Sequence, residues 1–123
     1  GNPDLYRVHA SGRLLEAPGL IALAYEKLGG LVHYHGKPYP RIYRSCLGIM
    51  GLPPDRVVGV GDSLAHDVAG AANAGIDACF IAGGIHKDDL DWPDGRKPEP
   101  GSCMALFARE NLRPRYCLPG FAW

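Results

Sequence analysis

The segment that ends at Asp67 constrains the fold more than any other part of this sequence. Its apolar run, residues 57–60, leads directly into Gly61, Asp62 and Ser63. A short apolar run of this kind is typical of a strand that is buried on both faces of a parallel sheet. Because a glycine after the strand allows a sharp turn, the next carboxylate is presented at the carboxyl end of the strand. The segment therefore predicts an α/β fold with acidic side chains at the end of a buried strand.

Helix and strand patterns alternate along the rest of the chain. The expected strands cover residues 5–9, 31–34, 57–60, 76–82 and 114–118. The expected helices cover residues 20–28, 40–50, 64–74 and 102–111, the last of them capped by Ser102. Residues 83–101 are expected to form a loop with a helical turn near Asp88. This order is the pattern of a parallel sheet with crossover helices.

Charge and hydropathy exclude two classes of partner. Lys plus Arg and Asp plus Glu number 13 each in 123 residues, so no net field attracts nucleic acid or an anionic membrane surface. Apolar stretches such as residues 20–25 fall far short of the roughly 20 residues that cross a bilayer. We therefore expect a protein that binds neither nucleic acid nor membrane.

The cysteines favour a reducing compartment. Cys46, Cys79, Cys103 and Cys117 are widely spaced, and no C-x-x-C pair is present. We expect reduced core thiols rather than disulfides or zinc ligands. Together with the absence of a secretory signal pattern, unpaired cysteines predict a cytoplasmic location.

Lys37 and two aspartates form the candidate site. Lys37 follows one predicted strand, while Asp62 and Asp67 follow another. Side chains at the carboxyl ends of strands converge in open α/β sheets. The two carboxylates could bind a single hard cation, and the lysine would offset the charge of a phosphoryl group. The alternatives are a solvated surface lysine, a helix N-cap at Asp62 and a first-turn acid at Asp67.

The same motifs carry a family resemblance. Gly36-Lys37-Pro38, residues 58–63 with Asp67, and residues 70–76 resemble motifs III and IV of the haloacid-dehalogenase (HAD) superfamily. Residues 2–4 and Pro18-Gly19 are similar to the end of the cap domain in subfamily IIA, which contains NagD-like and 4-nitrophenyl-phosphatase-like enzymes. The resemblance implies an incomplete HAD core, a Rossmann-like parallel sheet with flanking helices, over residues 31–123. It also implies that residues 1–30 are the C-terminal end of the cap domain.

The resemblance also implies an activity and a role for each site residue. It indicates a Mg²⁺-dependent phosphohydrolase that cleaves phosphate monoesters through a phospho-aspartate. Lys37 would steady the nucleophile and the phosphoryl oxygens, Asp62 would bind Mg²⁺ directly, and Asp67 would support the metal site. Ser63 and Asn2 are candidates for the periphery of the metal site and for the cap side. The substrate would be a small phosphorylated metabolite, and the resemblance allows a homodimer.

The chain departs from the family pattern in its nucleophile. The family's Asp-x-Asp-Gly motif and its Ser/Thr phosphate binder are expected upstream of residue 1, so we expect a longer protein and an inactive 123-residue chain. Without the strand that bears the nucleophile, the strand before Asp62 would expose an apolar edge. Asp89-Leu90-Asp91 matches Asp-x-Asp but does not follow a buried strand, so we interpret it as an acidic loop.

Two further readings stay open at this stage. For the whole chain, the alternative to an enzyme is a non-catalytic α/β module that binds phosphate or metal. His66 lies within the acidic motif and could touch the substrate, although a surface position is commoner for a lone histidine on a helix.

Overall fold

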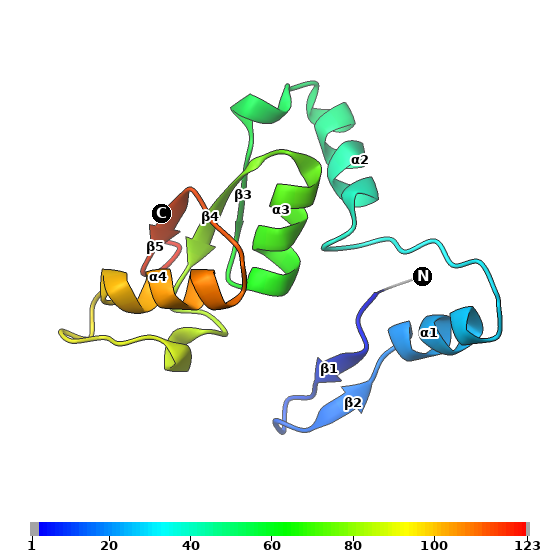
Figure 1. The fold of residues 1–123 in the computed structure, drawn as a ribbon, viewed down its shortest axis with the longest axis horizontal. Helices are drawn as coiled ribbons and strands as arrows, with labels where there is room; N and C mark the ends of the chain where they lie inside the picture. Colours follow the sequence, from blue (N-terminus) through cyan, green and yellow to red (C-terminus); the bar gives the residue numbers. More distant parts are fainter. Residues whose placement is uncertain (1–2, 123) are drawn as a thin grey trace.

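The chain forms two parts joined by an extended linking segment, residues 28–39 (Figure 1). This computed structural model describes residues 3–122. Near the N-terminus, β1 (Tyr6–Val8) and β2 (Leu14–Glu16) pair antiparallel, and α1 (Gly19–Lys27) follows. The backbone N–H of Gly19 donates to the carbonyl of Asp4 at 3.0 Å, so α1 begins against the residues that precede β1.

The second part contains a three-stranded parallel sheet. Its order is β3 (Val58–Gly61), β4 (Asp77–Ile81) and β5 (Tyr116–Leu118). The α-helices are α2 (Pro40–Met50), α3 (Ala69–Ala74) and α4 (Pro100–Arg109), with short helical turns at Pro54–Arg56, Leu64–Val68 and Lys87–Asp89. The predicted α/β fold, a parallel sheet with flanking helices, is confirmed.

One buried cluster joins the sheet to these helices. Phe80 of β4 is fully buried at its centre, and the ring of Phe107 from α4 meets it edge-on at 5.3 Å. The cluster consists of Leu64, Val68, Ala71, Ala78, Phe80, Ala82, Leu90, Cys103 and Leu106. Because Leu64 and Val68 of the turn after β3 belong to this cluster together with residues of β4 and α4, the cluster holds the turn on the sheet.

Two predictions of local structure are wrong. Residues 31–34 form no strand, because no described segment lies beside them to pair with, and Leu31 is 80% exposed. Ser102 does not cap α4: the helix begins at Pro100, and the carboxylate of Glu99 accepts the Ser102 N–H at 2.7 Å. A proline fits the first helical turn because it needs no hydrogen-bond partner for a backbone N–H.

The apolar strand is not buried on both faces, and its exposure agrees with the apolar edge expected for the strand before Asp62. Val58 and Val60 of β3 are 45% and 42% exposed, because only β4 pairs with β3 among residues 3–122. The cysteines are all free, as expected, but only Cys79 and Cys103 are buried. Among the described residues, none of the helices combines the length and apolar character that a membrane span needs.

Candidate functional site

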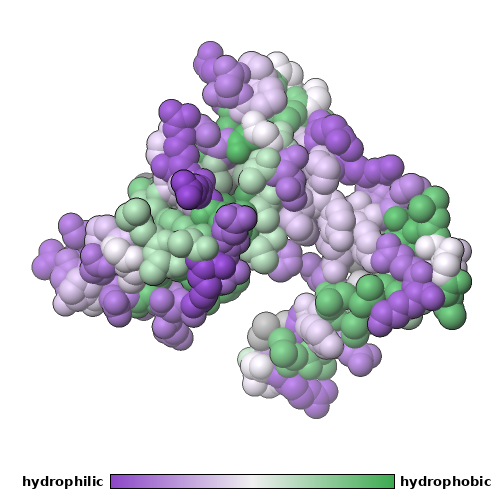
Figure 2. All heavy atoms as spheres, viewed as in Figure 1, coloured by the Kyte–Doolittle hydropathy of each residue, from purple (hydrophilic) through white to green (hydrophobic). Residues whose placement is uncertain are grey.

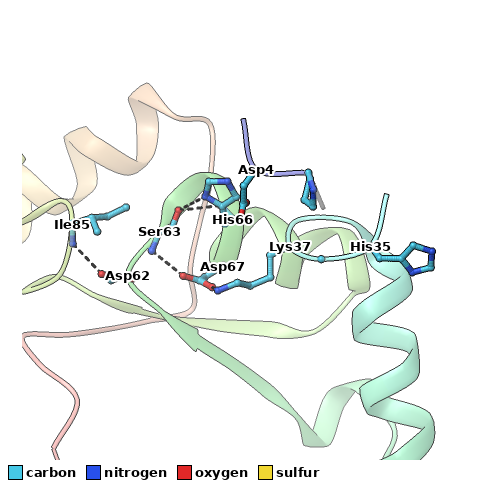
Figure 3. A pocket seen from close by; sticks show the side chains of 10 residues that line it. Asp4, His35, Lys37, Asp62, Ser63, His66, Asp67 and Ile85 are labelled. Carbon is cyan, nitrogen blue, oxygen red and sulfur yellow. Dashed lines mark hydrogen bonds and ion pairs between the residues drawn. The ribbon is translucent and has the colours of Figure 1, made fainter. Parts of the chain in front are cut away.

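A pocket of about 690 Å³ opens at the carboxyl end of β3 (Figure 3). Its walls come from four places in the sequence: the start of the described chain, the linking segment, the turn after β3 and the loop after β4. The lining residues are Pro3, Asp4, His35, Gly36, Lys37, Asp62, Ser63, His66, Asp67 and Ile85. The structure thus brings together the predicted residues Lys37, Asp62, Ser63 and Asp67, whereas the predicted Asn2 lies outside the described residues.

Asp67 holds the lysine of the pocket. Its Oδ1 lies 2.5 Å from the ammonium of Lys37, and its Oδ2 accepts the backbone N–H of Ser63 at 3.0 Å. The hydrogen bond that the Lys37 ammonium donates to Asp67 raises the pKa of Lys37, although partial burial of the ammonium opposes this effect. A Cβ atom at Gly61 would overlap the Asp67 side chain, so the carboxylate packs directly on the glycine backbone. Both carboxylate oxygens of Asp67 are therefore engaged by the protein itself.

Asp62 lies at the end of β3 and is held by the loop that follows β4. Its Oδ2 accepts the backbone N–H of Ile85 at 3.0 Å. A Cβ atom at Gly84 would overlap the Asp62 carboxylate, so only glycine permits this approach of the loop after β4. Within residues 3–122 the other carboxylate oxygen accepts no hydrogen bond, and Asp62 lines the pocket.

Ser63 and His66 form a hydrogen-bonded pair at the rim. Ser63 caps the turn Leu64–Val68, which contains His66 and is π-helical, with the N–H of Val68 donating to the carbonyl of Ser63 at 3.1 Å. The Ser63 hydroxyl lies 2.9 Å from Nδ1 of His66 and accepts the backbone N–H of His66 at 3.2 Å. Single π-turns are frequent at functional sites, because they redirect side chains that an α-helix would point elsewhere.

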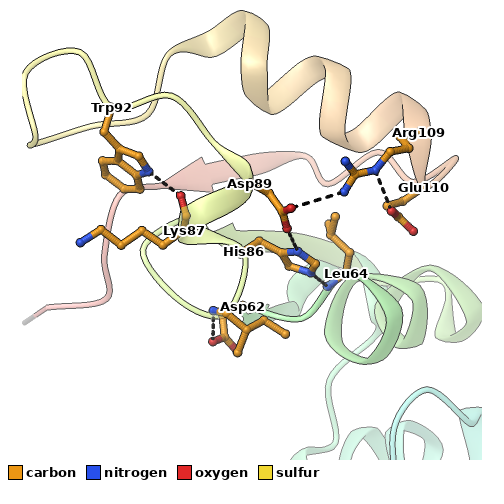
Figure 4. A network of polar contacts seen from close by, with 9 residues as sticks. Asp62, Leu64, His86, Lys87, Asp89, Trp92, Arg109 and Glu110 are labelled. Carbon is orange, nitrogen blue, oxygen red and sulfur yellow. Dashed lines mark hydrogen bonds and ion pairs between the residues drawn. The ribbon is translucent and has the colours of Figure 1, made fainter.

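The loop after β4 is held by a second polar network (Figure 4). His86 Nδ1 lies 2.8 Å from Asp89, whose second oxygen lies 3.8 Å from Arg109 of α4. The His86 hydrogen bond, supported by Arg109, lowers the pKa of Asp89. Asp89 contacts these two side chains rather than the pocket, which agrees with its interpretation as part of an acidic loop.

Sequence reasoning missed the contributions of Asp4, Gly84 and Ile85. Gly84 and Ile85 follow the predicted strand 76–82. Because ligands bind at the carboxyl ends of strands in open α/β sheets, the same signal that indicated Asp62 was present for these two residues. Asp4 reaches the pocket through the packing of the N-terminal segment, where Pro3 lies against Gly36. No local pattern signals such a contact.

The residues present fit a hard divalent cation at Asp62. The pocket holds three carboxylates, from Asp4, Asp62 and Asp67, against a single lysine. Among the described residues, no group of three or more His, Cys, Asp or Glu side chains is arranged to hold a metal ion. Mg²⁺ suits this donor set, because it usually takes one or two carboxylates and fills its other positions with water and phosphate oxygens.

Comparisons with known proteins relate the chain to one family. The family described as HAD-hydrolase-like matches residues 34–99. The chain is 34% identical over 113 residues to a phosphoserine phosphatase of Thermus thermophilus, covering 91% of this chain and 42% of that protein. It is 33% identical over 92 residues to the ribonucleotide monophosphatase NagD of Escherichia coli, covering 73% of this chain and 35% of that protein.

A solved structure supports the same relationship. The p-nitrophenyl phosphatase from Archaeoglobus fulgidus superimposes with a TM-score of 0.72 at 25% identity, over 97% of this chain and 41% of that one. The chain thus spans between 32% and 42% of the length of the first three curated relatives, among them a dihydroxyacetone phosphatase of Corynebacterium glutamicum.

Proposed function

Since the chain belongs to subfamily IIA of the HAD superfamily, we propose that it supplies the phosphate- and metal-binding part of a phosphatase. The strongest support for this proposal is that Lys37, Asp62 and Asp67 line one pocket at the carboxyl end of β3. We propose a small phosphorylated metabolite as the substrate and hydrolysis of its phosphate monoester as the reaction.

The chain's own residues account for the binding of the phosphoryl group. Lys37 provides an ammonium group, and its ion pair with Asp67 keeps that group in the pocket. The Ser63 N–H in turn holds the Asp67 carboxylate in place. A lysine paired with a carboxylate cannot by itself neutralise a phosphate dianion. We propose Mg²⁺ at Asp62, with Asp67 as its indirect support; when bound, the ion would neutralise charge that develops on the phosphoryl oxygens.

The covalent step needs a nucleophile that we place outside these 123 residues. A phospho-aspartate forms when a carboxylate attacks phosphorus and the alcohol leaves, and water then releases the phosphate. Neither Asp62, which is held by Ile85, nor Asp67, which is paired with Lys37, is proposed for the attack. We propose that residues 1–30 end a cap domain, that residues 31–123 belong to the catalytic core, and that the enzyme is a cytoplasmic protein and a homodimer.

The test is hydrolysis of 4-nitrophenyl phosphate by the complete gene product in the presence of Mg²⁺. Asp62→Asn and Lys37→Ala should each lower kcat/KM by at least about 100-fold, because the first weakens binding of the proposed Mg²⁺ and the second removes an ammonium group, so that each loses positive charge that stabilises the transition state. Asp55→Asn, which changes an exposed carboxylate of the Pro54–Arg56 turn, is the matched control and should have no effect.

Calorimetric titration with Mg²⁺ gives an independent readout. Asp62→Asn should weaken Mg²⁺ binding, whereas Asp55→Asn should not. Mg²⁺ binding without turnover of any ester would refute the enzyme and favour a non-catalytic module that binds phosphate or metal. Equal activity in the wild type and in Asp62→Asn would refute the assignment of this pocket.

A further inference from the structure

The side chains of Ser63 and His66, which are hydrogen-bonded to each other, have no part in the function proposed above. Both residues line the pocket, but Ser63 is buried while His66 is exposed. Figure 3 places the imidazole apart from the row formed by Asp62, Asp67 and Lys37. A phosphoryl group held by that row would therefore leave the remainder of its ester free to approach His66.

The Ser63 hydroxyl lies against Nδ1 of His66 and leaves Nε2 for other partners. The Ser63 hydroxyl oxygen already accepts the His66 backbone N–H at 3.2 Å, and its single hydrogen can point to Nδ1 at 2.9 Å. A neutral imidazole that accepts at Nδ1 is protonated at Nε2. Within the described part of the chain, Nε2 of His66 has no hydrogen-bond partner. A serine hydrogen directed to Nδ1 would leave Nε2 as an unused N–H donor at the rim of the pocket.

The surroundings of this donor favour a hydroxyl group as its acceptor. An N–H group binds an oxygen acceptor, which a leaving group can provide as a carboxylate or as a hydroxyl. Asp4 lines the same rim, and its carboxylate would repel a second carboxylate. A hydroxyl avoids this repulsion, because it can accept from Nε2 and still donate its own hydrogen to a carboxylate.

We propose that Nε2 of His66 carries the ring proton and that His66 is a specificity-determining residue, which selects phosphate monoesters with a hydroxyl group in their alcohol part. The inference rests on the proposed function, which accounts for the binding of the phosphoryl group. It adds a residue that recognises the alcohol part of the ester. Ser63 acts as a positioning residue, because it works only through the imidazole of His66.

The test compares two esters that differ by one group. 2-Hydroxyethyl phosphate carries the hydroxyl, and propyl phosphate has a methyl group in its place. In the complete gene product, His66→Ala should lower the ratio of kcat/KM for the hydroxylated ester to that for propyl phosphate by about tenfold, the effect of one hydrogen bond. His66→Gln keeps an N–H donor and should restore part of the ratio, and Ser63→Ala should lower it by less than His66→Ala.

His9→Ala is the matched control. Nδ1 of His9 lies 3.0 Å from the hydroxyl of Ser11, so it belongs to a similar His–Ser pair, but neither residue lines the pocket. The ratio of the two kcat/KM values for His9→Ala should equal that of the wild type. An unchanged ratio in His66→Ala, or an equal loss in His9→Ala, would overturn the proposal.

A binding measurement separates this proposal from the enzymatic one. In ¹⁵N spectra of the histidine rings in alkaline buffer, His66 should show the Nε2–H tautomer, and Ser63→Ala should weaken that preference. 2-Hydroxyethyl phosphate should shift the Nε2 signal more than propyl phosphate does, even if neither ester is hydrolysed. That result without turnover would refute the phosphatase alone, whereas an Nδ1–H tautomer or equal shifts would refute the role of His66.

Discussion

At the residue scale, the surroundings of a side chain decide its chemistry more than its exposure does. Asp67 is buried, yet Lys37 and the Ser63 N–H satisfy both of its carboxylate oxygens. Cys117 shows the opposite case. The residue is exposed on β5, but its thiol shares a second pocket with Cys103, and loss of hydration there raises the pKa of Cys117 to about 12.

The raised pKa predicts slow alkylation of Cys117. At pH 8 a smaller fraction of this thiol is ionised than in a thiol with the ordinary pKa of about 8.5, and only the thiolate reacts. Mass spectrometry after brief treatment with iodoacetamide should find Cys46, which is also exposed, modified before Cys117. Equal rates at the two residues would contradict the predicted shift.

The same shift predicts how stability depends on pH. Because the pKa in the folded state is above that in the unfolded state, the contribution of Cys117 is complete below about pH 8.5 and is lost as the pH rises toward about 12. Between pH 8 and pH 11 the wild type should therefore lose more free energy of unfolding than Cys117→Val. Urea titrations at the two pH values measure this difference, and parallel losses would count against it.

At the scale of elements, local patterns predicted the helices better than the strands. The helix over residues 40–50 agrees with α2, because its apolar spacing and flanking Pro and Gly residues are local signals. Residues 31–34 have strand composition but no neighbouring strand, and β2 was missed because three residues carry too little pattern. The spacing of Asp62 and Asp67 located the site, whereas the contact of Ile85 with Asp62 joins two loops that are 23 positions apart.

The loop that holds Asp62 depends on His86. Its Nδ1 lies 2.8 Å from Asp89, and its Nε2 lies 3.5 Å from the backbone nitrogen of Leu64, so the ring links the loop after β4 to the turn after β3. His86→Ala should lower the free energy of unfolding by about 1 kcal/mol, the net value of such hydrogen bonds. It should also speed hydrogen exchange at the Ile85 N–H and weaken Mg²⁺ binding.

The conservative variant and a distant control make this prediction specific. His86→Gln can still accept from Leu64 and should recover part of the Mg²⁺ affinity. His9→Ala lies in the N-terminal hairpin and should leave exchange at Ile85 unchanged. If His86→Ala lowered stability without faster exchange at Ile85, the ring would stabilise the core rather than hold the loop.

At the scale of the whole molecule, the described chain exposes two apolar surfaces. Figure 2 shows apolar residues over α1 and the linking segment, where Ile21, Leu28 and Leu31 are 75%, 87% and 80% exposed. The second surface is the free edge of β3, with Val58 and Val60. Large exposed apolar patches are uncommon on monomeric proteins, so both surfaces are candidates for contact with other protein segments.

The free edge of β3 predicts that the isolated 123-residue chain associates with itself. An unpaired strand presents N–H and C=O groups to a second strand, and Val58 and Val60 add apolar contact area. A lysine on an edge strand opposes such pairing, because its charge would have to be desolvated. Val60→Lys should therefore reduce association. Met104→Lys places the same charge on α4, where Met104 is 71% exposed, and should reduce it less.

Sedimentation velocity at rising protein concentration separates the outcomes. If the β3 edge drives association, the wild type and Met104→Lys should sediment as oligomers at concentrations at which Val60→Lys remains a monomer. Equal effects of the two lysines would indicate association through apolar surface in general. A wild-type chain that stays monomeric at about 100 μM, within the range in which exposed strand edges commonly associate, would show that this edge does not recruit a second strand.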